Sequence, residues 1–378
     1  MKLIHCADLH LDAKLQAHLD RERAKRRRDE LLRNFARLAD YAEQQDVDAV
    51  LIAGDLFDKD RVSALAKNTV LNVIGAHPGI RFYYLRGNHD TADCLRGSSA
   101  GAGIPENLFL FGNRWKTYRE GAEGRIVIAG IELTRENNAA AFAALRLDPS
   151  CFNIVLLHGQ ETSASGFSGA EDKTGSRIGV ISLPALRGRG IDYLALGHIH
   201  TWKKAPLDSR GTFCYPGCLE GRGFDESGPH GFALLEIDEQ RNTMTHRFVP
   251  FAQRALYTVD VDVTGCLTTA EMEERVKAAL REAGCGSGDM ADVTMRGELD
   301  VECEKDAGYL RTGLEARFFF ARLQDRTTLR IDPQEYLYDE SLRGEFVRVV
   351  LADPSIPEEE KTAVIRCGFQ AMDGEALL

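Results

Sequence analysis

Side chains that can bind metal ions follow five apolar stretches of strand length in this sequence. In chain order they are Asp8, His10, Asp55, Asn88, His89, His158, His198 and His200. Ligands of open α/β sheets gather outside the carboxyl ends of the strands. We therefore expect these eight side chains to lie close together at one edge of a sheet.

Two pairs among them are separated by two positions, Asp8 with His10 and His198 with His200. In an extended backbone, residues i and i+2 point to the same side of the chain. The spacing therefore predicts that both members of each pair face the same centre.

The donor atoms indicate which kind of centre this is. The donors are imidazole nitrogens, carboxylates and one amide oxygen, without any thiolate. Such a set is typical of a site for Mn²⁺, Fe or Zn²⁺ and not of a cysteine-rich structural zinc site. Seven ligands are too many for one catalytic metal that keeps a position for water, and they suit two metals that share a carboxylate. Two such ions, about 3.5–4 Å apart, clamp the attacking and departing oxygens of a phosphoryl displacement.

The ordered motifs D-x-H, G-D, G-N-H-D, H and G-H-x-H resemble the calcineurin-like metallophosphoesterase superfamily. The resemblance implies two metal sites, the first held by Asp8, His10, Asp55 and His200, the second by Asp55, Asn88, His158 and His198. It implies two divalent ions, with Mn²⁺ as the first choice and Fe, Mg²⁺ or Zn²⁺ as alternatives. His89 corresponds to the superfamily's catalytic histidine, which contacts the scissile phosphate and protonates the leaving oxygen. We expect Asp90 to orient His89.

Longer segments resemble the SbcD-type DNA repair nuclease subunits over residues 1–300. They are "HCADLHLDA", "LIAGDLFDKDRVS", "LPALRGRGIDYLALGHIHTW" and "YPGCLEGRGFDE". This resemblance implies a DNA exo- or endonuclease that acts in DNA repair, forms a homodimer and binds an SbcC-type coiled-coil ATPase through its C-terminal helices. One alternative is a phosphodiesterase or phosphatase for a small phosphorylated metabolite. The other is a non-catalytic scaffold of the same fold, although every ligand and His89 are present.

The order of apolar and amphipathic segments predicts an α/β fold. We expect a four-layer α/β/β/α sandwich over residues 1–255, a smaller α+β capping domain over 256–335, and a helical tail over 336–378. Amphipathic spacing predicts a helix over 20–45. The segment 159–179, which is rich in Gly, Ser and Thr, predicts a mobile loop over the site.

Shorter patterns in the cap and tail predict further helices. In the cap, a helix begins at Thr268 or Thr269 and stops at Gly284. Two more helices are expected near 341–352 and 357–373.

Several side chains allow two interpretations. The arginines at the start of the 20–45 helix contact a nucleic-acid backbone or form a solvated helix face. Arg86 and Arg222 are phosphate contacts or ordinary surface arginines. The apolar side chains of the last helix dock a partner or pack on the chain's own cap; they are Val364, Ile365, Phe369 and Met372.

Composition limits the class of protein. The chain is 44% hydrophobic with a net charge of −11, and the acidity is concentrated in residues 256–378, which hold 14 Lys+Arg against 26 Asp+Glu. That part suits a protein partner better than DNA. The sequence has neither the apolar run of a signal peptide nor one of membrane-spanning length. Without such an apolar run, we expect no membrane association. The nine cysteines include no C-x-x-C pair, so we expect a reducing cytoplasm.

Overall fold

The computed structural model of the chain divides into two compact units, Met1–Ala255 and Leu256–Leu378. The described residues are 1–15, 19–58, 62–95, 103–134, 137–162 and 179–372. Most of the loop that the sequence predicts over the site, residues 163–178, lies outside the described residues. Among the helices of the described ranges, none has both the length and the apolar character needed to cross a membrane.

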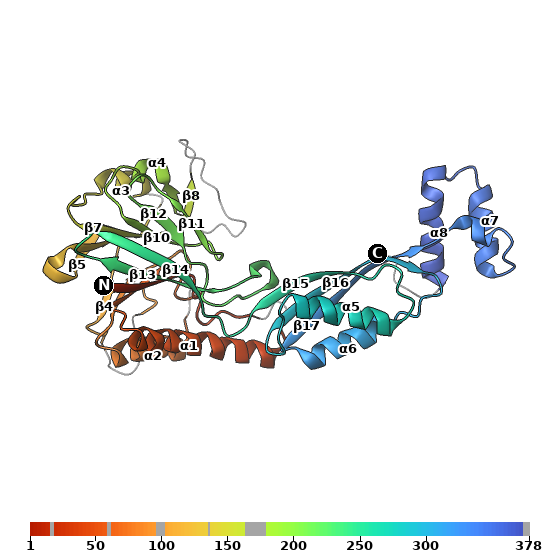
Figure 1. Ribbon diagram of the computed structural model, residues 1–378, viewed down its shortest axis with the longest axis horizontal. Helices are drawn as coiled ribbons and strands as arrows, with labels where there is room; N and C mark the ends of the chain where they lie inside the picture. The colour runs from red at the N-terminus through yellow and green to blue at the C-terminus, as the bar shows by residue number, and fades with distance from the viewer. Residues whose placement is uncertain (16–18, 59–61, 96–102, 135–136, 163–178, 373–378) are drawn as a thin grey trace. The chain divides into compact units, whose positions relative to one another are not determined.

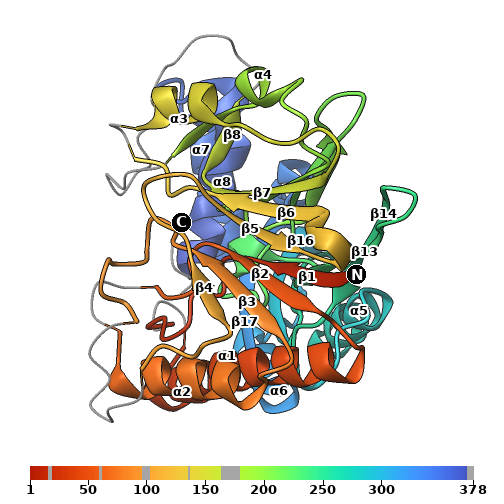
Figure 2. The ribbon, with the colours of Figure 1, turned by 90° about the vertical axis from the view of Figure 1, so that its left-hand side faces the viewer.

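The first unit contains two six-stranded mixed sheets (Figures 1 and 2). The strands of the first sheet, in spatial order, are β14 (Thr243–Pro250), β13 (Gly231–Asp238), β1 (Lys2–Cys6), β2 (Ala49–Ala53), β3 (Arg81–Leu85) and β4 (Leu108–Leu110). Those of the second are β11 (Lys203–Pro206), β12 (Thr212–Tyr215), β10 (Tyr193–Gly197), β7 (Phe152–His158), β6 (Ile126–Gly130) and β5 (Lys116–Glu120). A separate two-stranded pair is formed by β8 (Gln160–Thr162) and β9 (Val180–Ser182).

Helices cover the outer face of each sheet. They are α1 (Arg21–Gln44) and α2 (Ala64–Ala76) on the first sheet, and α3 (Asn138–Ala144) and α4 (Leu183–Leu186) on the second (Figure 2). Successive side chains of β2 alternate between two cores: Leu51 packs between the sheets, whereas Val50 and Ile52 pack under the helices. The predicted four-layer α/β/β/α sandwich is confirmed.

Helix α1 confirms the predicted helix over 20–45. It begins at Asp20, whose side chain accepts a hydrogen bond from the backbone N–H of Arg23, 2.8 Å away. One of its arginines belongs to neither predicted interpretation. Arg27 is buried, and its guanidinium bonds Glu30 at 2.9 Å and Glu220 at 3.2 Å. This ion cluster attaches the helix to the segment that follows β12.

The second unit contains a three-stranded sheet formed by β15 (Leu256–Asp262), β16 (Met290–Asp300) and β17 (Phe320–Arg330). Helices α5 (Thr269–Glu282) and α6 (Ala307–Arg317) connect them. As predicted, Thr268 caps α5, and Gly284 follows it with φ +80°. The sequence predicts a small α+β cap. Its three strands are parallel, so the two helices are the crossovers of a βαβαβ unit.

The tail contains α7 (Leu342–Ala352) and α8 (Glu358–Met372), close to the predicted bounds. Ile365 and Phe369 of α8 are fully buried in a core that includes Val347 of α7 and Ile331 beyond β17. Of the two interpretations of the α8 apolar face, packing on the chain itself is therefore confirmed for these two side chains.

We predict that Met272→Ala, made in residues 256–378 expressed alone, lowers the free energy of unfolding by about 2–5 kcal/mol, because the substitution leaves a cavity. Met272 is fully buried in the core of the second unit. Urea denaturation followed by circular dichroism measures the change.

The control is Glu282→Ala on the exposed side of the same helix, which should change the free energy of unfolding by no more than about 0.5 kcal/mol. A fragment without a cooperative transition would contradict the existence of an independent second unit.

Candidate metal centre

Seven of the eight side chains lie in the loops that follow β1, β2, β3 and β10, and the eighth, His158, is the last residue of β7. Strands β1, β2 and β3 are parallel neighbours in one sheet, and β7 and β10 are parallel neighbours in the other. Their carboxyl ends therefore lie on one edge of the sandwich. Hydrogen bonds join the two sheets there, since the Ala53 carbonyl lies 2.9 Å from Nδ1 of His158 and the His198 N–H donates to Asp8 at 2.9 Å.

A first cluster contains Asp8, His10 and His200, whose donor atoms all lie within 4.8 Å of one another. The Nε2 atoms of the two histidines are 3.2 Å apart. Their Nδ1 atoms face carboxylates: that of His10 lies 2.9 Å from Asp58, and that of His200 lies 2.5 Å from Glu226.

This arrangement fits a cation. When Nδ1 of each ring carries the proton, with Glu226 accepting that of His200 and the Asp58 carboxylate close to that of His10, both Nε2 atoms present lone pairs to each other. Two lone pairs 3.2 Å apart repel unless a positive charge lies beside both. The convergence of two imidazoles and one carboxylate is therefore suited to a divalent ion with mixed nitrogen and oxygen ligands.

A second cluster contains Asp8, Asp55 and His158, also within 4.8 Å of one another. His158 Nε2 lies 3.3 Å from Asp55 Oδ2 and 3.0 Å from Asn88 Oδ1. The same Asp55 oxygen is 3.9 Å from His10 Nε2, so this carboxylate faces both clusters. The His198 ring is 5.5 Å from that of His158, measured between centroids.

The charges of the site are strongly coupled. Burial opposes ionisation of Asp55. His158 outweighs this effect through its charge and its hydrogen bond, and His10 adds its charge, so the pKa of the Asp55 carboxyl lies well below its usual range. Burial also opposes protonation of His158, yet Asp55 and Asp8 raise its pKa to about 9. The buried carboxylates therefore stabilise positive charge at this edge of the sheets.

The backbone is left-handed at four of the predicted ligands, with φ values of 53° at Asp8, 44° at His10, 51° at Asp55 and 111° at His198. Positive φ is uncommon outside glycine and is concentrated at functional sites. The prediction that Asp8 and His10 share a side of an extended segment is therefore wrong in its geometry. They approach one centre because the chain turns at each of them.

Three glycines beside the ligands are required by close packing. A Cβ at Gly54 would lie 2.1 Å from His158 Nδ1, one at Gly87 2.1 Å from Asp55 Oδ1, and one at Gly197 1.9 Å from the Ala53 carbonyl. No side chain fits at such distances. The glycines of the G-D, G-N-H-D and G-H-x-H motifs thus allow the ligand loops to touch.

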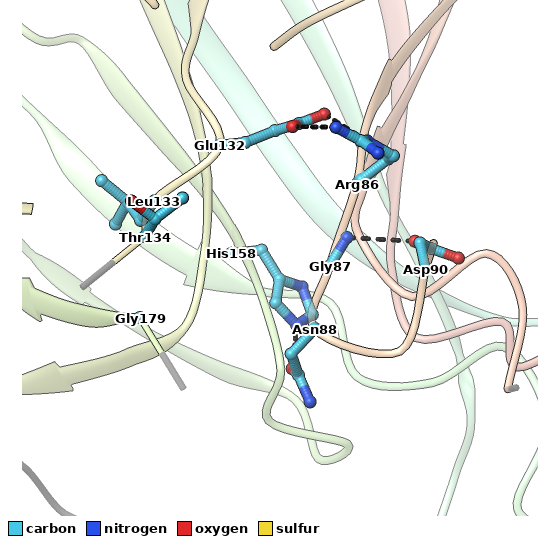
Figure 3. A pocket seen from close by; sticks show the side chains of 9 residues that line it. All are labelled: Arg86, Gly87, Asn88, Asp90, Glu132, Leu133, Thr134, His158 and Gly179. Carbon is cyan, nitrogen blue, oxygen red and sulfur yellow. Dashed lines mark hydrogen bonds and ion pairs between the residues drawn. The ribbon is translucent and has the colours of Figure 1, made fainter. Parts of the chain in front are cut away.

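Asp90 joins two of these loops. Its carboxylate accepts hydrogen bonds from the backbone N–H groups of Leu56 at 3.1 Å and Phe57 at 2.9 Å. It also accepts one from the backbone N–H of Gly87 at 3.0 Å (Figure 3). The sequence predicts that Asp90 orients His89. Instead, Asp58 faces that ring, with its Oδ1 atom 3.8 Å from His89 Nδ1.

Both arginines that the sequence offers as phosphate contacts are paired with carboxylates. Arg86 bonds Glu132 at 2.7 and 2.5 Å beside a cavity of about 330 Å³ that Asn88 and His158 also line (Figure 3). Arg222 bonds Asp58 and Glu226, each at 2.9 Å.

Sequence reasoning missed three carboxylates, Asp58, Glu132 and Glu226. Two of them do stand in motif-bearing segments, Asp58 in "GDLFD" and Glu226 in "GRGFDE".

Several known proteins are similar to this chain. The "Uncharacterized metallophosphoesterase YhaO" of Bacillus subtilis is 29% identical over 249 residues, which are 63% of this chain and 57% of that protein. The "DNA double-strand break repair protein Mre11" of Aeropyrum pernix is 25% identical over 281 residues, 69% of this chain and 64% of that protein. The protein of the same name from Methanopyrus kandleri is 26% identical over 300 residues, which are 73% of this chain and 62% of that protein. The chain thus matches less than two thirds of the length of each.

A family profile described as "Calcineurin-like phosphoesterase" matches residues 1–202, which are more than half of the chain. The matched segment ends two residues after His200, so it contains all eight side chains predicted for the centre. The chain therefore belongs to the calcineurin-like phosphoesterase family.

Proposed function

We propose that this protein is a two-metal phosphodiesterase whose substrate is DNA. The observation that carries the proposal is the pair of histidine Nε2 atoms facing each other at 3.2 Å, with the Asp55 carboxylate beside them. In this proposal one cation is held by Asp8, His10, Asp55 and His200, and the other by Asp55, Asn88, His158 and His198. Mn²⁺ is the ion that we propose for both. The similarity to proteins named for DNA double-strand break repair supports the choice of substrate.

The bound cations would supply a nucleophilic hydroxide and neutralise the phosphate oxygens. Among the chain's own residues, we assign His89 as the proton donor. Its side chain is 42% exposed, and its ring centroid lies 5.0 Å from that of His10. With Nδ1 facing Asp58, Nε2 of His89 is free to give a proton to the leaving oxygen.

A second candidate substrate is a small phosphodiester. The cavity of about 330 Å³ beside Asn88 and His158 favours it, because this volume is in the range of small-molecule sites. The Arg86–Glu132 pair on its wall would then recognise polar groups of the ligand.

The wider context is also part of the proposal: a homodimer in the cytoplasm that repairs DNA with an SbcC-type coiled-coil ATPase. All nine cysteines are unpaired, which suits a reducing compartment. The tail offers apolar surface for the ATPase mainly on α7, while on α8 Met372 is 39% exposed. Tyr338 before the helix is 93% exposed, and Leu342 and Val349, two turns apart, are 72% and 58% exposed.

We predict that the wild-type chain binds two Mn²⁺ ions and that Asp55→Asn weakens both, because the substitution removes negative charge from the shared carboxylate. Isothermal titration calorimetry and metal analysis of the dialysed protein measure affinity and stoichiometry. Glu236→Gln, at an exposed position of β13, is the control and should bind like the wild type. One ion or none in the wild type would refute the two-metal proposal.

We predict that His89→Ala lowers kcat on DNA by about 10²–10⁴-fold without changing Mn²⁺ affinity, since it removes the proton donor but no ligand. An aryl phosphodiester should be affected less, because an aryl oxide departs without protonation. The assay compares end-labelled duplex DNA, single-stranded DNA and the aryl ester, with Mn²⁺ or chelator.

The matched control is His77→Ala, which changes a histidine at the end of α2 and should leave cleavage unaltered. Cleavage of the aryl ester without cleavage of either DNA would refute the nuclease and favour the small-diester candidate.

We predict that Leu342→Glu with Val349→Glu weakens binding of a co-expressed SbcC-type ATPase at least about tenfold, because a charge would be buried in the interface. Co-purification and surface plasmon resonance measure the loss. Leu267→Glu, at an exposed apolar position of the cap, is the control. Equal binding by all three proteins would exclude this surface.

A further inference from the structure

Arg222 lies between the two carboxylates that face the histidines of the first cluster. Its Nη1 donates to Asp58 Oδ1 at 2.9 Å and its Nη2 to Glu226 Oε1 at 2.9 Å. Asp58 Oδ1 is the atom 2.9 Å from His10 Nδ1, and Glu226 Oε1 is the atom 2.5 Å from His200 Nδ1. One guanidinium thus connects both rings through one oxygen on each side, and its Nη2 also lies 3.1 Å from Nδ1 of His200.

The contact with Glu226 indicates which nitrogen of the His200 ring carries the proton. A carboxylate oxygen 2.5 Å from a ring nitrogen requires a hydrogen between the two atoms, because two lone pairs would otherwise overlap. Nδ1 of His200 is therefore the donor, which leaves its Nε2 as an acceptor that points toward Nε2 of His10. Nδ1 of His10 lies 2.9 Å from Asp58 Oδ1 but makes no hydrogen bond among the described residues, so Asp58 acts on this ring through its charge.

The chain segments that meet at Arg222 come from both sheets. Asp58 follows β2, and Glu226 ends the 3₁₀ turn Phe224–Glu226 after β12. Arg222 is itself held by Glu226, whose Oε2 accepts the Arg222 backbone N–H at 2.8 Å. The side chain is 21% exposed. Its donors are occupied inside the protein, so its role as a phosphate contact is disfavoured.

The contacts are also confined to one part of the centre. His158 Nδ1 faces the Ala53 carbonyl, and its Nε2 faces Asn88 and Asp55. The network from Arg222 reaches His10 and His200, while His158 takes its hydrogen bonds from elsewhere.

We propose that Arg222 is a positioning residue of the metal centre: by holding Asp58 and Glu226 together, it aims Nε2 of His10 and His200 at one cation. The inference rests on the proposed two-cation site. A guanidinium suits this role because it presents separate donors to two acceptors in a fixed plane, which a lysine ammonium does not. Partners that orient metal-binding histidines in this way typically contribute 10–100-fold to metal affinity.

The experiment measures Mn²⁺ binding by calorimetry in the full chain. We expect Arg222→Gln to weaken one of the two binding steps by about 10–100-fold and to leave the other within about threefold. In a His158→Ala background, the step that remains should be the one that Arg222→Gln weakens. Glu226→Gln should weaken the same step, and Arg222→Lys should give an intermediate affinity.

Arg210→Gln is the matched control. Arg210 bonds Asp192 at 2.9 and 2.8 Å and also two backbone carbonyls. It lies before β12, at the opposite end of the strands from the centre. The variant loses a comparable set of hydrogen bonds, so it should lose stability while both Mn²⁺ affinities remain unchanged.

The outcomes separate this inference from the proposed function. Two wild-type ions with both affinities unchanged in Arg222→Gln would overturn the positioning role and leave the two-metal proposal intact. Equal weakening of both steps would indicate general damage and would also overturn it. If Arg222→Gln does not fold, Glu226→Gln decides by the same criterion. Fewer than two ions in the wild type would overturn both proposals.

Discussion

The centre depends on compensating the negative charge of two buried carboxylates. Asp8 and Asp55 are each 1% exposed and lie within hydrogen-bonding or ion-pair distance of ligand-bearing loops from the opposite sheet. An ionised carboxylate without compensation is very costly in such a place. His158 supplies part of this charge, because Asp55 and Asp8 raise its pKa to about 9 against the effect of burial. Divalent cations would supply it more completely, and the other features of the site follow from that need.

The sandwich makes this concentration of charge tolerable. Five strands with buried side chains on both faces end at one edge, so the loops begin from fixed positions. The loops can then contain left-handed residues such as Asp8 and Asp55, whose conformational cost is of order 1–3 kcal/mol each and is offset by the cores beneath. Gly87 and Asp90 serve the same end, because the first admits the Asp55 carboxylate and the second joins the loops after β2 and β3.

Patterns local in the sequence predicted much of this structure. An apolar run followed by polar side chains identified the five segments that carry the site, amphipathic spacing identified α1, and shorter patterns identified both tail helices. Contacts between distant segments were not predictable in this way. Glu226 pairs with a histidine 26 residues earlier, and Asp58 contacts Arg222 from 164 residues away. Nothing in a single sequence distinguishes these carboxylates from solvated ones. The extended-strand argument failed for Asp8 and His10 because backbone handedness in a loop depends on the contacts that it makes.

The pairing of the arginines has a consequence for substrate binding. Arg86 is neutralised by Glu132, and Arg222 by Asp58 and Glu226. Among the described residues of the centre, the exposed side chain that remains to meet a phosphate is His89. Bound cations would therefore supply the positive charge that an anionic phosphodiester needs at this edge, above the buried carboxylates of Asp8 and Asp55. In the proposed function they would serve substrate binding as well as hydrolysis, and the orientation of His10 and His200 by Arg222 would act on both.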